Sequence, residues 1–270
     1  MTTFQKVIKY FAIAFAALLI VNIISGICYG LQTISSLFGS PDAEERMKEF
    51  TQSEAENALY VSLGGAELVI KNGDTFKADF DEKYISCHQA GNKMLIMQKK
   101  TELFGKDKVC AVTIYVPEAM MFDVADIEVG AGQVTIGELN AKELSLDMGA
   151  GETVIGKLNV TEKAEIDCGA GAFMVESGSI ANLSADTGMG EFNLGSRLTG
   201  SSEINHGMGE ANIRLIGDAG DYTVNLDKGM GEATLNGQIV SGGSYGNGAS
   251  YVEADCGMGA IHIDFFEENQ

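Results

Sequence analysis

The sequence is short of several residue types, and each shortage excludes a class of protein. It has no Trp and only 2 Pro, against 34 Gly, among 270 residues. Abundant Gly with so little Pro excludes a collagen-like chain and disfavours a disordered Pro-rich linker. The 5 cysteines form no CxxC pair and are too scattered for a disulfide scaffold or a zinc ribbon. With 45% hydrophobic residues, the chain is expected to fold around an apolar core.

Basic residues are scarce as well. The chain has 18 Lys and Arg against 38 Asp and Glu, a formal net charge of −20. Such a charge repels phosphate groups and excludes nucleic acid as a partner. Cations, cationic peptides and neutral glycans remain as candidate partners.

One long apolar run lies near the N-terminus. Residues 10–31 read YFAIAFAALLIVNIISGICYGL and contain no charged residue, and about 20 apolar residues span a bilayer as a helix. Lys6 and Lys9 precede the run and acidic residues follow it, so the positive-inside rule predicts that residues 1–9 are cytoplasmic and the C-terminal part is extracellular. We expect an uncleaved, single-pass anchor in the cell membrane. A cleaved signal peptide is the alternative, although its apolar core is usually shorter.

A polar connector, 32–54, follows the anchor. Ser40-Pro41-Asp42, with Glu44 and Glu45 next, predicts a short helix near 41–50. The remaining chain divides into a strand-repeat domain, 55–265, and a tail, 266–270.

The repeat domain is marked by a recurring Gly-Xaa-Gly motif, whose first glycines are 19, 20, 19, 19, 22 and 28 residues apart. Such a period indicates stacked structural repeats. The motif glycines are Gly130 and Gly132, Gly149 and Gly151, Gly169 and Gly171, Gly188 and Gly190, Gly207 and Gly209, Gly229 and Gly231, and Gly257 and Gly259.

Apolar residues flank each motif with a period of two, which indicates strands. Three positions before the first glycine stand Ile127, Leu146, Ile166, Ala185, Ile204, Leu226 and Ala254. A 19-residue unit at about 3.3 Å per residue is about 60 Å of chain, the perimeter of a small coil. We therefore predict an all-β, right-handed β-solenoid with rungs of about 19–20 residues, stacked in chain order around this apolar column. The glycines are expected at corners, where positive φ or close backbone approach is required.

The two ends of the coil are less regular. An earlier rung is expected at Leu59–Phe80, with Gly64-Gly65 as its corner. The runs Met94–Met97 and Ala111–Val116 flank a charged turn and predict a hairpin that caps the N-terminal end. The long last interval predicts a surface loop before a final strand, Ala260–Phe265.

Four segments carry a resemblance to a known family. They read LYVSLGGAELVIKNGDTF, VTIYVP, IEVGAGQVTIGEL and YGNGASYVEADCGMGAIHIDF. Over roughly residues 55–265 the chain resembles the bacterial putative adhesin family, a β-strand-repeat domain of unknown function common in Gram-positive bacteria. The resemblance implies an envelope-facing domain with a binding, adhesion or stress-sensing role, and it supplies no catalytic residues.

One acidic ladder is the candidate binding site. Carboxylates recur two positions before and three positions after the first glycine, on the outward phase of the strands; they are Asp147, Asp167, Asp186, Asp227 and Asp255, and Glu152, Glu191, Glu210 and Glu232. Stacked carboxylates suit Ca²⁺ or a cationic peptide. The alternative is that each Asp only caps its own corner by accepting backbone N–H bonds. No resident cofactor is expected otherwise.

Two further positions of the motif invite a hypothesis. The central residue is Ala in the first three motifs and Met189, Met208, Met230 or Met258 in the others, where gap-filling corner packing is expected rather than an exposed or copper-binding stripe. The residue before the motif includes both Met148 and Lys228, so His206 is expected to be half-exposed.

Enzyme chemistry is not predicted. The acidic residues repeat at every level instead of clustering at one, and no nucleophile with a base and an orienting acid stands out. We predict a non-catalytic binding module, with a self-assembly module and a polysaccharide-active enzyme as alternatives. Self-association is expected if the coil ends with an uncovered strand edge.

Overall fold

The computed structural model describes residues 43–99 and 110–266. The chain divides into two units, Met1–Arg46 and Met47–Gln270, and every strand of the described residues belongs to the second. The elements are almost all strands. In chain order they are α2 (Ala43–Gln52), β1 (Ala58–Asn72), β2 (Lys77–Phe80), β3 (Ile85–Ala90), β4 (Lys93–Gln98), β5 (Cys110–Val116), β6 (Phe122–Ala181), β7 (Leu183–Thr199), β8 (Ser201–Ile216), the 3-10 turn η1 (Ala219–Asp221), β9 (Tyr222–Leu235), β10 (Gln238–Ile239), β11 (Gly243–Gly246) and β12 (Ser250–Phe266).

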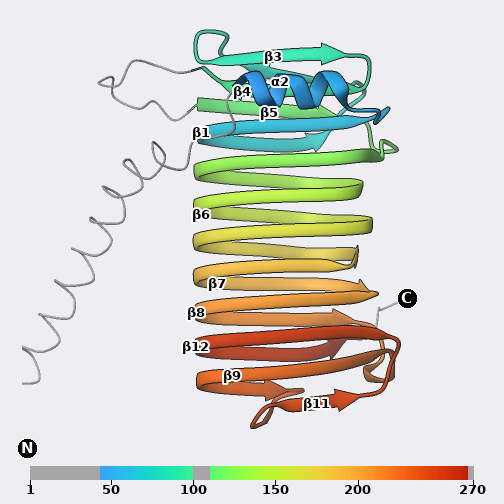
Figure 1. Ribbon diagram of the computed structural model, residues 1–270, viewed down its shortest axis with the longest axis vertical. Coiled ribbons are helices and arrows are strands. Elements are labelled where there is room, and N and C mark those ends of the chain that lie inside the picture. The colour runs from blue at the N-terminus through green and yellow to red at the C-terminus, as the bar shows by residue number, and fades with distance from the viewer. Residues whose placement is uncertain (1–42, 100–109, 267–270) are drawn as a thin grey trace, which may run out of the picture. The chain divides into compact units, whose positions relative to one another are not determined.

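The long strands form a coil of stacked rungs (Figure 1). β1 pairs in parallel with β6, β6 with β7, and β7 with β8, so that equivalent positions of successive repeats lie side by side. Strand β6 is continuous over 60 residues because it winds through three corners without a break. The β-solenoid architecture predicted from the repeat period is therefore present, with rungs that are parallel neighbours.

The order of the last rungs differs from the prediction. Strand β12 pairs in parallel with β8 on one side and with β9 on the other, so the C-terminal rung is inserted before the rung that precedes it in the chain (Figure 1). The long interval before β12 makes this insertion feasible, since that segment returns past β9 and forms β10 and β11 against it. The predicted stacking in chain order is wrong here, and it leaves Cys168 and Cys256 three rungs apart.

The corner glycines are required for two separate reasons. A Cβ on Gly149 would lie less than 3.0 Å from the carbonyl oxygen of Gly130 in the neighbouring rung, although the backbone of Gly149 is ordinary. Gly151 has a φ of +136° as well as a backbone oxygen of the neighbouring rung at its Cβ position. The first glycine of each corner thus permits close approach, and the second, in every corner except that of Gly231, also permits the positive φ of the turn.

The predicted apolar column forms the core. Ile127, Leu146, Ile166, Ile204 and Leu226 are all at most 2% exposed. On the other side of the corner a second column includes Phe173 and Phe192, whose rings stack with centroids 5.4 Å apart at 12°. Both columns are buried because alternate residues of each strand point inward.

The N-terminal end corrects the predicted hairpin. β4 and β5 contain the two runs expected to pair with each other, yet each instead pairs in parallel with β1. Their antiparallel partners are β3, paired with β4, and β2, paired with β5. This end is still capped, because the short antiparallel strands cover the first rung and Phe50 of α2 packs edge-on against Tyr60 (Figure 1).

The predicted membrane anchor, 10–31, lies outside the described residues. Within residues 43–99 and 110–266, the structure contains no helix with the length and hydropathy needed to cross a bilayer. Helix α2 lies where the connector is predicted to contain one.

The phase of the strands makes a sharp mutational prediction. Ile166→Asp places an unpaired charge in the core and should remove cooperative unfolding, or lower the unfolding free energy by more than about 4 kcal/mol. Asp167→Asn, one residue along on the exposed face, should leave the fold intact. Chemical denaturation followed by far-ultraviolet circular dichroism tests both, and equal tolerance of the two changes would contradict the assigned phase.

Candidate functional site

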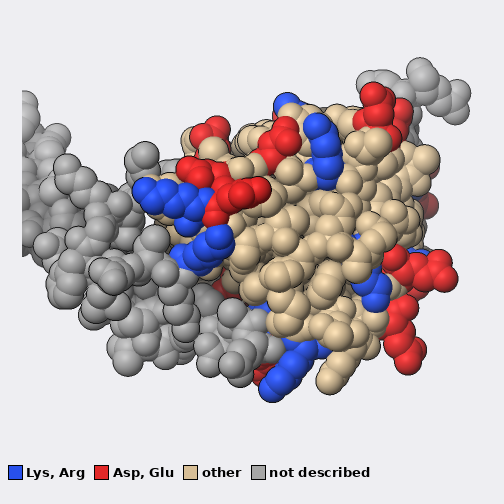
Figure 2. All heavy atoms as spheres, turned by 90° about the horizontal axis from the view of Figure 1, so that it is seen from above, with Lys and Arg blue, Asp and Glu red and all other residues tan. Residues whose placement is uncertain are grey.

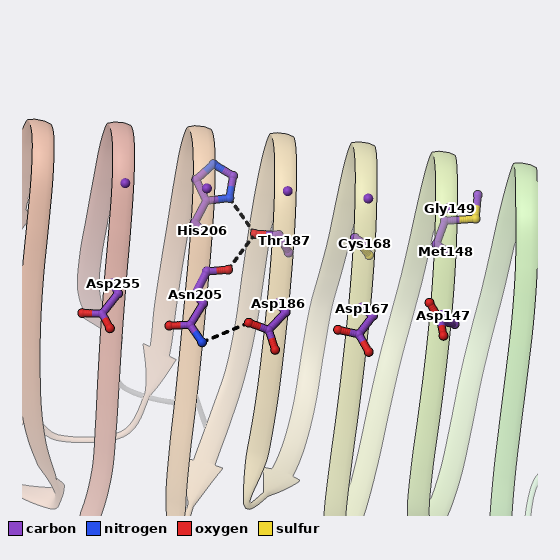
Figure 3. Close-up of a pocket in the computed structure, with 14 residues that line it drawn as sticks. Asp147, Met148, Gly149, Asp167, Cys168, Asp186, Thr187, Asn205, His206 and Asp255 are labelled. Atoms are coloured by element: carbon purple, nitrogen blue, oxygen red, sulfur yellow. Dashed lines mark hydrogen bonds between the residues drawn. The ribbon is translucent and has the colours of Figure 1, made fainter. Parts of the chain in front are cut away.

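The candidate site is the edge of the coil that carries the corners. We call the row two positions before each first glycine the acidic edge; in spatial order it runs Asp147, Asp167, Asp186, Asn205, Asp255, Asp227. Figure 3 shows the first five of these side chains along neighbouring rungs, pointing to one side of the coil. They are exposed or half-buried, as the outward strand phase predicts. The insertion of β12 places Asp255 between Asn205 and Asp227.

The carboxylates of the acidic edge affect one another. Burial raises the pKa of Asp167 above its usual range, and the neighbouring Asp186 and Glu165 add to the effect. The pKa of Asp255 is raised by burial and by Glu253, Asp227 and Glu203. Burial and mutual repulsion therefore disfavour the charged forms of these carboxylates, and a bound cation would offset both effects.

Asn205 interrupts this repulsion. Its Nδ2 donates to Asp186 Oδ1 at 3.0 Å and to Glu203 Oε1, also at 3.0 Å (Figure 3). A neutral donor in a row of acceptors orients its neighbours without adding negative charge. The sequence shows this residue as a departure from Asp, but not the hydrogen bonds that it makes.

Corner capping does not account for three carboxylates of the acidic edge. In the described part of the chain, the carboxylates of Asp167, Asp227 and Asp255 accept no hydrogen bond from a backbone N–H. A carboxylate does accept backbone hydrogen bonds at another place in the fold. Asp123 Oδ2 accepts hydrogen bonds from the backbone N–H groups of Glu56 and Asn57, at 2.8 and 3.0 Å. Lys142 and these two bonds lower the pKa of Asp123 to about 2. The three edge carboxylates are thus available to a ligand.

A second row, one position nearer the corner, points inward. In spatial order it includes Met148, Cys168, Thr187, His206 and Cys256. His206 is only 2% exposed, so the prediction that it is half-exposed is wrong. The comparison with Lys228 was misleading because Lys228 belongs to the last rung of the stack, where the row ends and its side chain reaches Gly231 O at 3.3 Å.

His206 is held by a short hydrogen-bond chain. Thr187 Oγ1 donates to Asn205 O at 3.2 Å, and the same oxygen lies 2.6 Å from His206 Nδ1 (Figure 3). Because a hydroxyl can donate to or accept from Nδ1, this contact is compatible with a neutral imidazole of either tautomer. Burial lowers the pKa of His206 and favours the same neutral form. Its Nε2 is buried, with no hydrogen-bond partner in the described residues.

The acidic edge and the inward row line a shallow open groove of about 550 Å³. Its lining includes Asp147, Asp167, Asp186 and Asp255. Among the described residues, no basic side chain (Lys or Arg) and no Phe, Tyr or Trp lines it. Burial, with Asp167 and Asp147, raises the pKa of the Cys168 thiol to about 12. That thiol is protonated at neutral pH and is a poor nucleophile. The groove is fitted to attract positive charge rather than to carry out bond-breaking chemistry.

Metal coordination by clustered carboxylates is not preformed. No group of three or more His, Cys, Asp or Glu side chains has metal-binding geometry within the described residues. The rung spacing of about 4.8 Å places one carboxylate per level instead of several around a point. On the other side of the corner, Glu152, Glu191, Glu210 and Glu232 are all exposed. The first three each accept a hydrogen bond from a side-chain amide, at 3.2 Å from Gln133, 2.7 Å from Asn193 and 3.2 Å from Asn212 respectively.

The methionines at the corner tips correct another prediction. Met189, Met208, Met258 and Met230 are 42%, 45%, 42% and 69% exposed. They do not fill gaps in the core, because the middle residue of the motif points away from the coil between two glycines. A stripe of exposed thioethers therefore lies beside the acidic edge.

The far N-terminal end has a different charge pattern. Figure 2 shows the end that carries β3 and α2, where Lys and Arg side chains lie among Asp and Glu around the rim. At this end Lys71 and Lys77 lie over the ring of Tyr115, at 4.9 and 4.6 Å from its centroid. Charges of both signs are therefore present at this end.

Sequence comparison supplies the family. Residues 64–250, more than two thirds of the chain, match the Toastrack DUF4097 family. The chain belongs to the Toastrack DUF4097 family. The resemblance to the putative adhesin family drawn from the repeat motifs is confirmed, with a repeat domain of unknown function. No curated protein matches the chain.

Two solved structures are similar to this Toastrack chain at a distance. A putative cell adhesion protein from Clostridium sporogenes is 19% identical with a TM-score of 0.37, and the match covers 78% of this chain and 92% of that one. A putative adhesin from Bacteroides fragilis is 9% identical with a TM-score of 0.35, over 79% of this chain and 94% of that one.

The buried imidazole predicts a pH dependence for the Toastrack unit. His206 has a lowered native pKa, so between that pKa and the unfolded value of about 6.5 the unfolded chain binds a proton that the native one does not. Its contribution to stability is complete above about pH 6.5 and is lost as the pH falls, with a slope of at most about 1.4 kcal/mol per pH unit.

The measurement is urea unfolding between pH 5.5 and 7.5, for the wild type and for His206→Met. Met occupies the equivalent position at Met148, so the variant is compatible with the row. The wild type should lose more stability on acidification than the variant. Identical slopes would show that His206 is charged or solvated in the native state.

Proposed function

We propose that the chain is a non-catalytic, adhesion-type binding protein that is anchored in the cell membrane and displays its coil to the cell envelope. The acidic edge is the binding surface, and its ligand is a positively charged envelope component or peptide. The single observation that carries the proposal is the row of exposed or half-buried carboxylates along successive rungs, two of them with raised pKa values.

The charge-free apolar run 10–31 and the lysines before it support the anchor. The right-handed sense of the coil, the extracellular side of the domain and a stress-sensing role belong to the same proposal. A membrane anchor would hold many copies of the edge at one surface, so that weak single contacts add up to firm attachment.

The competing functions have less support. Catalysis would need an activated nucleophile or a paired acid and base, whereas Cys168 is protonated and the imidazole of His206 is buried and neutral. Self-assembly through open strand edges is disfavoured, because short antiparallel strands accompany both ends: β2 and β3 at one, β10 and β11 at the other.

The test is binding of a polycation to the full-length chain in lipid vesicles. An oligolysine peptide should bind the wild type and raise the melting temperature of the coil, since a ligand that binds only the folded state stabilises it. Binding should weaken as salt is added, because the attraction is between exposed charges. Ca²⁺ at matched ionic strength shows whether a divalent ion can replace the peptide.

The decisive variant is Asp147→Asn/Asp167→Asn/Asp186→Asn/Asp227→Asn, which should lose most of the peptide binding while being at least as stable as the wild type. A matched control removes four exposed carboxylates elsewhere, Asp74→Asn/Asp79→Asn/Glu82→Gln/Glu118→Gln. It carries the same change in net charge and should bind like the wild type. Equal loss in both variants would reduce the effect to net charge and contradict a binding edge.

A further inference from the structure

The exposed methionines form one unbroken row on four successive rungs. Met189 is the register partner of Met208, Met208 of Met258, and Met258 of Met230. Met258 is the last of the four in the chain but the third in space, because β12 lies between β8 and β9. We call these four residues the methionine row. Its continuity is a product of the fold and is not apparent from the chain order.

The corner itself does not require methionine. The same tip position is held by Ala131, Ala150 and Ala170 in the preceding rungs, with the same glycines on either side. Each methionine leaves a large apolar side chain between 42% and 69% exposed. Neither burial nor corner geometry explains why these four tips carry methionine. What the four rungs share is an exposed thioether group.

The spacing of the row suits a metal ion held by neighbouring sulfurs. Equivalent positions of parallel strands are about 4.8 Å apart. Two sulfurs on one ion are at most about 4.6 Å apart if each metal–sulfur bond is about 2.3 Å. Met side chains have three rotatable bonds and can make the small adjustment, and the flanking glycines have no side chain to obstruct it. Thioethers are soft ligands that favour Cu(I) over hard cations.

The charge around the row favours a cation. Glu191 and Glu210 lie two residues after their tip methionines, and Asp186 three residues before Met189, all exposed. These carboxylates raise the local concentration of positive ions without being soft ligands. Thioethers carry no proton to lose, so binding by them does not require deprotonation.

We propose that the methionine row binds a soft monovalent cation, Cu(I) or its redox-stable analogue Ag(I), through thioether sulfurs of adjacent rungs. The site differs from the proposed polycation site in its ligand atoms, which are thioether sulfurs instead of carboxylate oxygens. Ca²⁺ and Zn²⁺ are not expected to bind to the row. The proposal involves no change in oxidation state and needs no second reactant.

The first measurement is a titration of the full-length chain in detergent with Ag(I), after labelling the methionine methyl groups with ¹³C. The methyl resonances of the four row residues should shift, and those of the buried Met94 and Met148 should not. Ca²⁺ should leave the row resonances unchanged. A titration in which the row resonances do not move would overturn the proposal.

Two sets of variants distinguish the contribution of the sulfur atoms from that of side-chain size and apolarity. Met189→Ala/Met208→Ala/Met258→Ala/Met230→Ala gives these tips the residue that the earlier corners already carry, so the fold should persist, as thermal melting will check. Calorimetric affinity for Ag(I) should fall by more than about 100-fold, since the loss of outer-shell partners alone costs about 10–100-fold at metal sites. The corresponding four Met→Leu changes should reduce the affinity equally while keeping an apolar stripe.

The matched control is Met121→Ala/Met174→Ala, which removes two exposed methionines outside the row. It should bind Ag(I) like the wild type. Every variant keeps all the cysteines, so binding by thiols is common to all of them and cancels in the comparison. Affinity retained by the Leu variant, or lost equally in the control, would contradict a thioether site in the row.

Discussion

The close approach of backbones at the corners is the constraint on which the rest of the structure depends. The carbonyl oxygen of each corner occupies the space where the next rung would otherwise carry a Cβ. Only glycine fits there, and its recurrence fixes the level of every rung. Once the corners are aligned, strand alternation determines which residues are buried and which are presented. The acidic edge, the inward row and the methionine row are all consequences of that alignment.

Much of this architecture could be predicted from local pattern. The period of two around each motif identified Ile127 and Ile166 as core and Asp167 as surface, and the structure agrees. These predictions succeed because side-chain direction in a strand depends only on position relative to the corner. The family was recognisable for the same reason, since the repeat motifs are themselves the folding signal.

The order of the rungs could not be predicted in this way. The corners at Gly207, Gly229 and Gly257 are nearly equivalent in sequence, so local pattern does not say which of them are neighbours. The pairing of β12 with both β8 and β9 depends on where a 28-residue interval leads the chain. The hairpin error has a similar origin: β4 and β5 each satisfy their hydrogen bonds with β1, a partner distant in sequence.

The candidate site shows the same division. Which carboxylates face outward followed from the sequence, whereas the environment of His206 did not, because its burial reflects the middle of the stack and that of Lys228 reflects its end. The exposure of the tip methionines was also missed, since a middle residue between two glycines has no counterpart in a regular strand. Side chains at one repeated position of a solenoid therefore point the same way, but their burial and their neighbours differ from rung to rung. Those differences in burial and neighbours determine what each residue can do.

The most direct measurement of the central claim is the unfolding free energy of Gly171→Ala beside that of Ala170→Met. Gly171 has a φ of +138°, and a Cβ there would meet the backbone of Gly151 at less than 3.0 Å. Gly171→Ala should therefore lower the unfolding free energy by more than about 3 kcal/mol. Ala170→Met, which installs the tip residue of the neighbouring rung, should change stability by less than about 0.5 kcal/mol. Comparable effects of the two substitutions would contradict the claim that corner contact between rungs organises this fold.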